Sequence, residues 1–132
     1  MTAKGPSDRP DVELRLPADG AYVSVLRTTT AGLAARLDFT LEDIEDLRVA
    51  VGEASSIALE SADDGADLTA RFWFGQRRIT VAVSAGAADA AQPDTDSFAW
   101  MVLTTLAESA TVDTTGGELT VVITIAATPL DS

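Results

Sequence analysis

The chain of 132 residues contains no cysteine and no histidine. These absences exclude disulfides, thiolate nucleophiles, imidazole bases and metal sites built from cysteine or histidine. They also exclude every catalytic triad that depends on histidine. No apolar run approaches the roughly 18 residues that a membrane-spanning helix needs. The chemistry left to the chain rests on carboxylates, hydroxyls, arginines and backbone groups.

Cations are also scarce, with 9 Lys and Arg against 21 Asp and Glu and a formal net charge of −12. Proteins that bind nucleic acid or anionic membranes need a cationic face, so both classes are excluded. The acidity favours a basic partner or a highly soluble surface. Residues 1–10 have no apolar stretch behind their charges, so we expect no signal peptide and a cytoplasmic protein.

Hydrophobic residues make up 46% of the chain and charged residues 23%. This mixture and length are typical of one globular domain with its own core. No internal repeat is visible. We expect a disordered tail at residues 1–11 and a single domain at residues 12–128.

Hydrophobic periodicity predicts the elements of that domain. Alternation of period two indicates strands, and spacing of three and four residues indicates helices. The prediction is a strand at 12–16, helices at 22–37 and 40–61, a hairpin at 68–74 and 79–83, a loop at 85–96, a helix at 98–106, and strands at 111–113 and 119–127. Antiparallel strands with helices on one side predict an α+β fold, a two-layer sandwich with a mostly antiparallel sheet.

Polar residues mark where the helices begin. Thr40 and Asp43 resemble a capping box at the start of the second helix, whose apolar face we expect to begin at Leu41. Thr95 or Asp96 is expected to cap the third helix.

Residues 42–64 hold eight acidic residues and one basic residue, Arg48. They form either the solvated face and cap of one helix or an electronegative surface complementary to a basic protein. Neither interpretation suggests hydrolysis, because carboxylates on an outer helical face do not acquire the perturbed pKa values that such work needs.

Known phosphate-binding motifs are absent, since the chain has neither G-x-x-x-x-G-K-[ST] nor G-x-G-x-x-G. The scattered carboxylates lack the spacing of a metal site. Phe72, Trp73 and Phe74 are consecutive, so their side chains must divide between the two faces of a strand and are expected to pack in the fold rather than form a stacking surface. The residues alone thus indicate an acidic domain that binds protein.

Two segments resemble a known family. The order of elements and the segment at 44–56, IEDLRVAVGEASS, are similar to the SpoIIAB/RsbW anti-sigma factors, small relatives of the histidine-kinase and Hsp90-type ATPases. The segment at 97–107, SFAWMVLTTLA, resembles their actinobacterial, UsfX-like branch. The resemblance covers residues 12–127. It implies the histidine-kinase-like ATPase fold.

The resemblance also implies nucleotide-binding motifs, and this chain departs from them. The family motif E-A-x-x-N-A supplies a catalytic base and an asparagine that holds Mg²⁺. Glu53 stands at the base position here, but Ile57 stands where the asparagine would be, and an aliphatic side chain cannot ligate a hard cation.

Two further motifs are altered. The family motif D-x-G, whose aspartate accepts from adenine, reads Ser84-Ala85-Gly86 here. The motif G-x-G before the third helix reads Ser97-Phe98-Ala99, and the added side chains narrow the approach to phosphates.

Phosphoryl transfer depends on metal, positioning and electrostatics, so these departures predict lost kinase activity. We expect no cofactor, although weak binding of Mg-ATP stays open. Glu53 is then a packing or capping residue, with no catalytic residue and no metal site expected.

Partner binding does not need those motifs. The resemblance implies that an arginine of the first helix contacts both an alternative sigma factor and a competing anti-anti-sigma (STAS-domain) protein, and Arg27 stands at that place. Without the resemblance, Arg27 would be read as a surface arginine with a packed stem. The implied function is an anti-sigma factor that forms a homodimer. The alternatives are an active serine kinase of the anti-anti-sigma factor and a non-catalytic adaptor for another regulator.

Overall fold

The computed structural model describes residues 5–129. In chain order the elements are β1 (Val12–Pro17), a 3-10 turn η1 (Gly20–Tyr22), α1 (Val23–Arg36), α2 (Leu41–Ser61), β2 (Asp67–Gly75), β3 (Arg78–Gly86), α3 (Phe98–Leu106), β4 (Ser109–Asp113), a 3-10 turn η2 (Thr115–Gly117) and β5 (Glu118–Ala126). The predicted order of strands and helices is confirmed.

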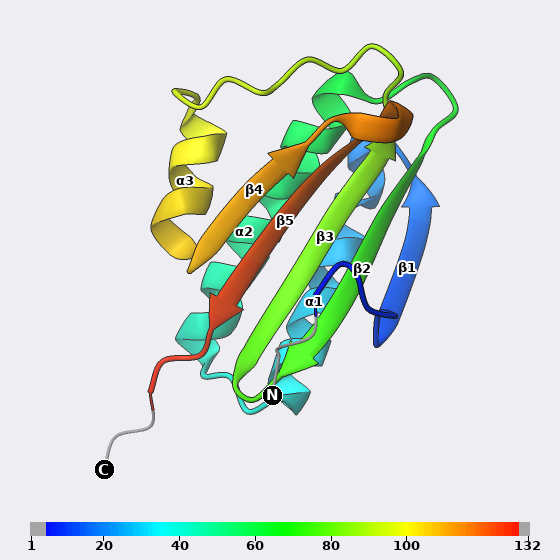
Figure 1. Ribbon diagram of the computed structural model, residues 1–132. Helices are drawn as coiled ribbons and strands as arrows, with labels where there is room; N and C mark the ends of the chain where they lie inside the picture. The colour runs from blue at the N-terminus through cyan, green and yellow to red at the C-terminus, as the bar shows by residue number, and fades with distance from the viewer. Residues whose placement is uncertain (1–4, 130–132) are drawn as a thin grey trace.

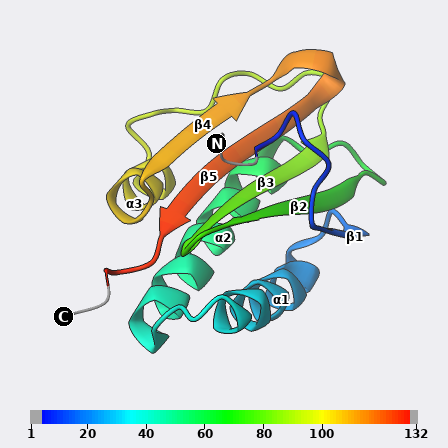
Figure 2. The ribbon, with the colours of Figure 1, turned by 60° about the horizontal axis from the view of Figure 1, so that its bottom comes forward.

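The five strands form one antiparallel sheet in the order β1-β2-β3-β5-β4. Helices α1 and α2 cover one face of this sheet, behind it in Figure 1 and below it in Figure 2. The third helix, α3, lies beside β4 and packs against α2. The architecture is therefore the predicted two-layer α+β sandwich.

The core fills the space between the helices and the sheet. Its strand residues alternate along β3 and β5, where Ile79, Val81, Val83, Val121 and Ile123 are all fully buried. Alternation in a strand sends every second side chain to the same face, so the residues between them point away from the helices. The last strand, β5, lies inside the sheet, between β3 and β4.

The opposite face of the sheet is partly covered by the start of the chain, which crosses it in Figure 1. The indole N–H of Trp73 donates to the carbonyl of Asp8 at 3.0 Å. The backbone N–H of Asp11 donates to the carbonyl of Phe72 at 2.8 Å. Residues 5–11 of the predicted tail thus contact β2, and residues 1–4 lie outside the described residues. Trp73 lies on this face and Phe72 in the core, as predicted.

The start of α2 departs from the predicted capping box. The hydroxyl of Thr40 accepts from the backbone N–H of Asp43 at 3.1 Å, so the predicted cap is confirmed. The Asp43 carboxylate accepts from the backbone N–H and the hydroxyl of Thr128, at 2.8 and 2.6 Å. Leu41 was wrongly placed on the buried face and is 83% exposed.

Asp43 is also the exception among the acidic residues of 42–64, because it is buried. Burial alone would raise the pKa of its carboxyl, but hydrogen bonds from Thr128 and Thr40 to the charged form hold that pKa below its ordinary value. This carboxylate joins the start of α2 to the segment that follows β5.

The start of α3 corrects another prediction. Ser97 caps the helix, since its hydroxyl accepts from the backbone N–H of Trp100 at 3.2 Å, whereas Thr95 and Asp96 were the predicted caps. The loop before it begins only after Gly86, because β3 extends to that residue. Gly116 and Gly117 adopt φ of 71° and 75° and turn the chain into β5.

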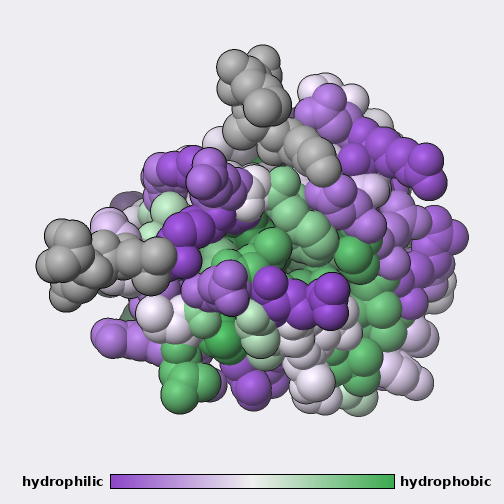
Figure 3. Space-filling model, turned by 90° about the horizontal axis from the view of Figure 1, so that it is seen from below, coloured by the Kyte–Doolittle hydropathy of each residue, from purple (hydrophilic) through white to green (hydrophobic). Residues whose placement is uncertain are grey.

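The surface is mixed. Hydrophobic areas lie among hydrophilic ones on the side shown in Figure 3. Across residues 5–129, none of the helices combines the length and the apolar character needed to cross a membrane.

Candidate functional site

A cavity of about 380 Å³ lies between the second half of α2 and the segment that leads into α3. This segment leaves the end of β3 and passes over the end of α2 in Figure 1. The cavity is lined by Ser56, Ile57, Glu60, Ser61, Ala91, Gln92, Pro93, Asp94, Ser97 and Ala99. Three residues selected from the family motifs, Ile57, Ser97 and Ala99, therefore meet in one place.

The other motif residues lie elsewhere. Ser84 pairs with Thr69 of β2 and Thr120 of β5, on the face of the sheet away from the helices. The Ser84 side chain is therefore directed away from the cavity, which lies on the helix side of the sheet. Ala85 is the neighbour whose side chain joins the helix-side core. A one-residue shift along a strand reverses the face that a side chain occupies.

Gly86 is likewise absent from the lining of the cavity. A Cβ on Gly86 would meet the Cβ of Ala66 at 3.6 Å, an ordinary contact. Its carbonyl accepts from the backbone N–H of Asp63 at 2.8 Å, and the Asp63 carboxylate accepts from the backbone N–H of Ala88 at 3.0 Å. Gly86 thus helps to join the end of α2 to the start of the loop.

The cavity does not suit a nucleoside triphosphate with its magnesium ion. No arginine or lysine is among the described residues that line it, while two carboxylates, Glu60 and Asp94, are. Ile57 is 5% exposed and belongs to the core, so it offers no oxygen to a metal. Within residues 5–129 no group of three or more His, Cys, Asp or Glu side chains could hold a metal ion.

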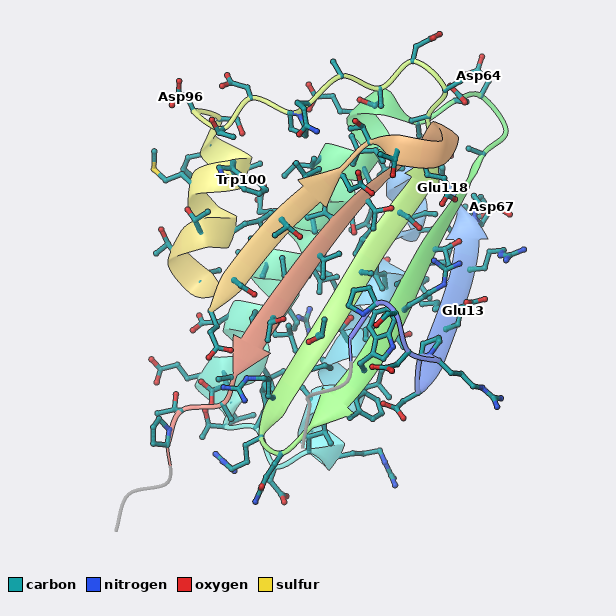
Figure 4. All side chains as sticks on the ribbon, in the orientation of Figure 1. Glu13, Asp64, Asp67, Asp96, Trp100 and Glu118 are labelled. Atoms are coloured by element: carbon teal, nitrogen blue, oxygen red, sulfur yellow. The ribbon has the colours of Figure 1, made fainter. Side chains whose placement is uncertain are left out.

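The start of α3 is also occupied by the protein's own groups. Helix N-termini attract anions because their first N–H groups are unpaired. Here Ser97 accepts from one of these groups, and Asp94 accepts from the backbone N–H of Asp96 at 2.8 Å. Figure 4 places Asp96 just before the helix. These two carboxylates repel a phosphate from the place where the family motif would bind it.

A second feature is a shallow groove between α1 and α2. It is lined by Arg27, Glu45, Arg48, Val49, Gly52, Glu53 and Ser56. Arg27, the residue selected for partner binding, therefore shares a groove with Glu53, which the family motif placed at the catalytic base position. Glu53 does not line the cavity that holds Ile57 and Ser97.

Gly52 explains why Arg27 lies across α2. A Cβ on Gly52 would stand 2.8 Å from Nη1 of Arg27, closer than real Cβ contacts come. The missing side chain thus leaves room for the guanidinium against the helix. Within residues 5–129 neither an ion pair nor a hydrogen bond holds this guanidinium.

Other arginines are engaged. Arg78 makes two hydrogen bonds of 2.9 Å to the carboxylate of Glu108, and Arg71 pairs with Glu13 at 2.9 Å. The paired charge raises the pKa of Arg78 and lowers that of Glu108, in each case chiefly through their hydrogen bond. Arg27 differs from these residues because its donors stay available to an outside partner.

Gly52, Glu45 and Arg48 were not predicted to be neighbours of Arg27. Positions 45, 48, 52 and 56 follow the spacing of one helical face, and this pattern is visible in the sequence. The packing angle of α1 on α2 is not visible there, and it decides which face Arg27 meets.

No protein-family model matches the chain. The chain is 36% identical over 76 residues to the serine-protein kinases RsbW of Bacillus velezensis and Bacillus subtilis, over 55% of this chain and 48% of each relative. It is 33% identical over 75 residues to the RsbW of Bacillus cereus. The match thus spans about half the length of these curated relatives.

The fold matches a solved structure. The crystal structure of the RsbU and RsbW domains of Rv1364c from Mycobacterium tuberculosis superposes with a TM-score of 0.67, over 92% of this chain and 34% of that chain, at 16% identity. This likeness establishes the fold. Together with the sequence matches to RsbW, it agrees with the resemblance of residues 12–127 to the SpoIIAB/RsbW family.

Proposed function

We propose that this chain is an anti-sigma factor that acts without nucleotide chemistry. It would hold an alternative sigma factor away from RNA polymerase and release it to an anti-anti-sigma (STAS-domain) protein. The observation that carries the proposal is the contrast at α2. Among residues 5–129 the Arg27 guanidinium lies unpaired in one groove, and no arginine or lysine is among the described residues that line the adjoining cavity.

Arg27 supports the partner-binding part of the proposal. A guanidinium presents its N–H groups as a planar fork that binds a carboxylate with two parallel hydrogen bonds. Gly52 leaves space for this group at the α2 surface. A partner carboxylate that enters the groove would meet a cation whose hydrogen-bonding capacity is not already used.

The cavity supports the absence of kinase activity and of a cofactor. Phosphoryl transfer needs a metal ion and cations placed around the phosphates. Ile57 and the carboxylates Glu60 and Asp94 provide neither. Glu53 would be a partner-facing residue rather than a base, because it lies beside Arg27.

The net charge of −12 supports a basic partner. Figure 4 places Asp64, Asp67 and Glu118 at one end of the sheet and Glu13 on β1. Sigma factors carry basic surfaces for promoter DNA, and complementary charge would speed association with them. The protein would then act in the cytoplasm, where it meets RNA polymerase.

A homodimer through the sheet belongs to the same proposal. The family resemblance implies it. Sedimentation at micromolar concentration would distinguish a dimer from a monomer.

The test combines two measurements on the full chain. Calorimetric titration with Mg-ATP is expected to give no heat, and a sigma factor is expected to co-purify from the lysate of the source organism. Micromolar binding of Mg-ATP would overturn the nucleotide-independent part and favour the serine kinase. If the chain neither binds Mg-ATP nor retains a sigma factor, the adaptor would be favoured.

A further inference from the structure

The helix α3 is apolar, yet little of it is buried. Seven of its nine residues, in the sequence FAWMVLTTL, are apolar, and Leu103 is the single buried residue within it. Phe98 is 74% exposed and Met101 is 57% exposed. Isolated exposed hydrophobic side chains are ordinary on protein surfaces, but here they gather on one short helix.

These side chains border a groove between α2 and α3. The groove is lined by Asp46, Val49, Met101, Val102, Thr105 and Leu106 and has a volume of about 370 Å³. Val49, from α2, is 48% exposed. Phe98, Met101 and Thr105 follow helical spacing along α3, so the exposed stripe continues from the groove to the start of the helix.

Asp46 is the charged residue in the lining of this groove, whereas the cations Arg27 and Arg48 line the adjoining groove toward α1. On the same helix as Asp46, Glu42 lies about one turn earlier and Glu45 is the preceding residue. Asp94 and Asp96 precede Phe98, and α3 itself has no charged residue. An apolar strip with acidic ends is complementary to an apolar strip with cationic flanks.

The groove also continues into the groove that holds Arg27. Val49 lines both, with Arg27 on one side of α2 and Met101 on the other. A partner segment bound between α2 and α3 would therefore lie next to the partner-binding site proposed above.

We propose that the groove between α2 and α3 binds a cationic amphipathic helix of a partner protein. Its apolar side would pack on Val49, Met101 and Leu106, and its lysines or arginines would face Asp46 and Glu45. Nine residues of α3 span about 13 Å, enough for two to three turns of the bound helix. The inference does not depend on whether this partner is a sigma factor.

The test uses the one methionine that lies in the groove. Met101 is one of two methionines in the chain, and the other is Met1. Protein labelled with ¹³C at the methionine methyl groups is titrated with a synthetic 14-residue peptide of leucine and lysine that has one apolar helical face. The Met101 methyl signal is expected to shift and saturate, and the shift is expected to shrink at high salt.

Two peptides and two variants control this experiment. A peptide of the same composition without helical periodicity, and one with glutamate in place of lysine, are expected to leave Met101 unshifted. Val49→Glu is expected to weaken binding about tenfold or more, because it removes apolar contact and adds like charge. Val25→Glu, at a 44% exposed position of α1 outside the groove, is expected to leave the affinity unchanged.

Equal shifts with the aperiodic peptide, or equal loss of affinity in both variants, would overturn the proposal. A Met101 shift that depends on protein concentration without peptide would also overturn it, because a second copy of the chain would then occupy the groove. These peptide measurements do not depend on the sigma-factor test, so the failure of one proposal can be distinguished from the failure of the other.

Discussion

Two adjoining regions of α2 differ in the groups that they offer to a ligand. On the side facing α1, Gly52 makes room for an arginine whose donors are unpaired in the described part of the chain. On the side facing the loop before α3, Ile57 belongs to the core and the polar groups are carboxylates and hydroxyls. Binding depends on which groups remain free to exchange partners, and the two regions can be tested separately.

Arg27→Ala addresses the first region and has the largest expected effect. If the guanidinium pairs with a partner carboxylate, its removal leaves that charge unpaired and costs about 2 kcal/mol or more, roughly 30-fold in affinity. Calorimetry with the co-purified partner measures it. Arg36→Ala, also on α1 and exposed, is the matched control and is expected to change affinity little. Equal losses in both variants would indicate general charge attraction.

Ile57→Asn addresses the second region by placing the family's asparagine in this chain. The substitution buries an amide in the core and is expected to cost about 2–4 kcal/mol of unfolding free energy. It is expected to bring no heat with Mg-ATP, because the cavity still lacks cations. Ile57→Val, which keeps an apolar side chain, is expected to cost about 1 kcal/mol. Saturable ATP binding by Ile57→Asn would show that one residue separates this chain from a nucleotide site.

Asp43→Asn tests the far end of the same helix, away from both regions. Loss of the charged acceptor of the Thr128 hydrogen bonds is expected to cost about 1–2 kcal/mol of unfolding free energy at neutral pH, with partner affinity unchanged. Because the pKa of Asp43 is lowered in the folded state, its stabilisation is complete above the unfolded value near 3.9 and is lost as pH falls through the folded-state value.

Thermal unfolding from pH 7 to pH 2 measures this dependence. The difference in stability between the original chain and Asp43→Asn is expected to shrink at the acidic end. Glu42→Gln, in the same first turn of α2 but exposed, is the control. A difference that stayed constant with pH would contradict the role given to the charged carboxylate.

Gly52→Ala has the smallest expected effect and gives two opposite readouts. A Cβ at this position displaces the flexible end of Arg27, which stands 2.8 Å away. Alanine in a helix interior is expected to stabilise the fold by about 0.5–1 kcal/mol, while partner affinity falls several-fold. Denaturant unfolding and calorimetry measure the two effects. Unchanged affinity would mean that the position of Arg27 on α2 is irrelevant to binding.

Local patterns in the chain were sufficient to predict most elements. The spacing in α1 and α2, the cap at Thr40 and the turn at Gly116 and Gly117 depend on neighbours in sequence. Predictions were wrong where a distant residue competes for a group. The Asp43 carboxylate accepts from the hydroxyl of Thr128, 85 residues away, and no local rule predicts this contact.

The candidate site was predicted only in part, for a related reason. The sequence identifies Ile57, Ser97 and Ala99 as positions of altered motifs, and the structure brings them together. It separates Ser84 and Gly86 from them, because the register of β3 decides which face each side chain occupies. Glu53, which the motif placed at the catalytic base position, lines the groove that holds Arg27.

The sequence by itself determined the order of elements, the acidity and the absence of cysteine and histidine chemistry, because these follow from composition and from periodicity within each element. The tertiary structure decided which charged groups remain unpaired and which apolar residues of α3 stay exposed. Both depend on how helices pack on one another and on the sheet, and packing joins residues whose separation in the chain carries no local signal.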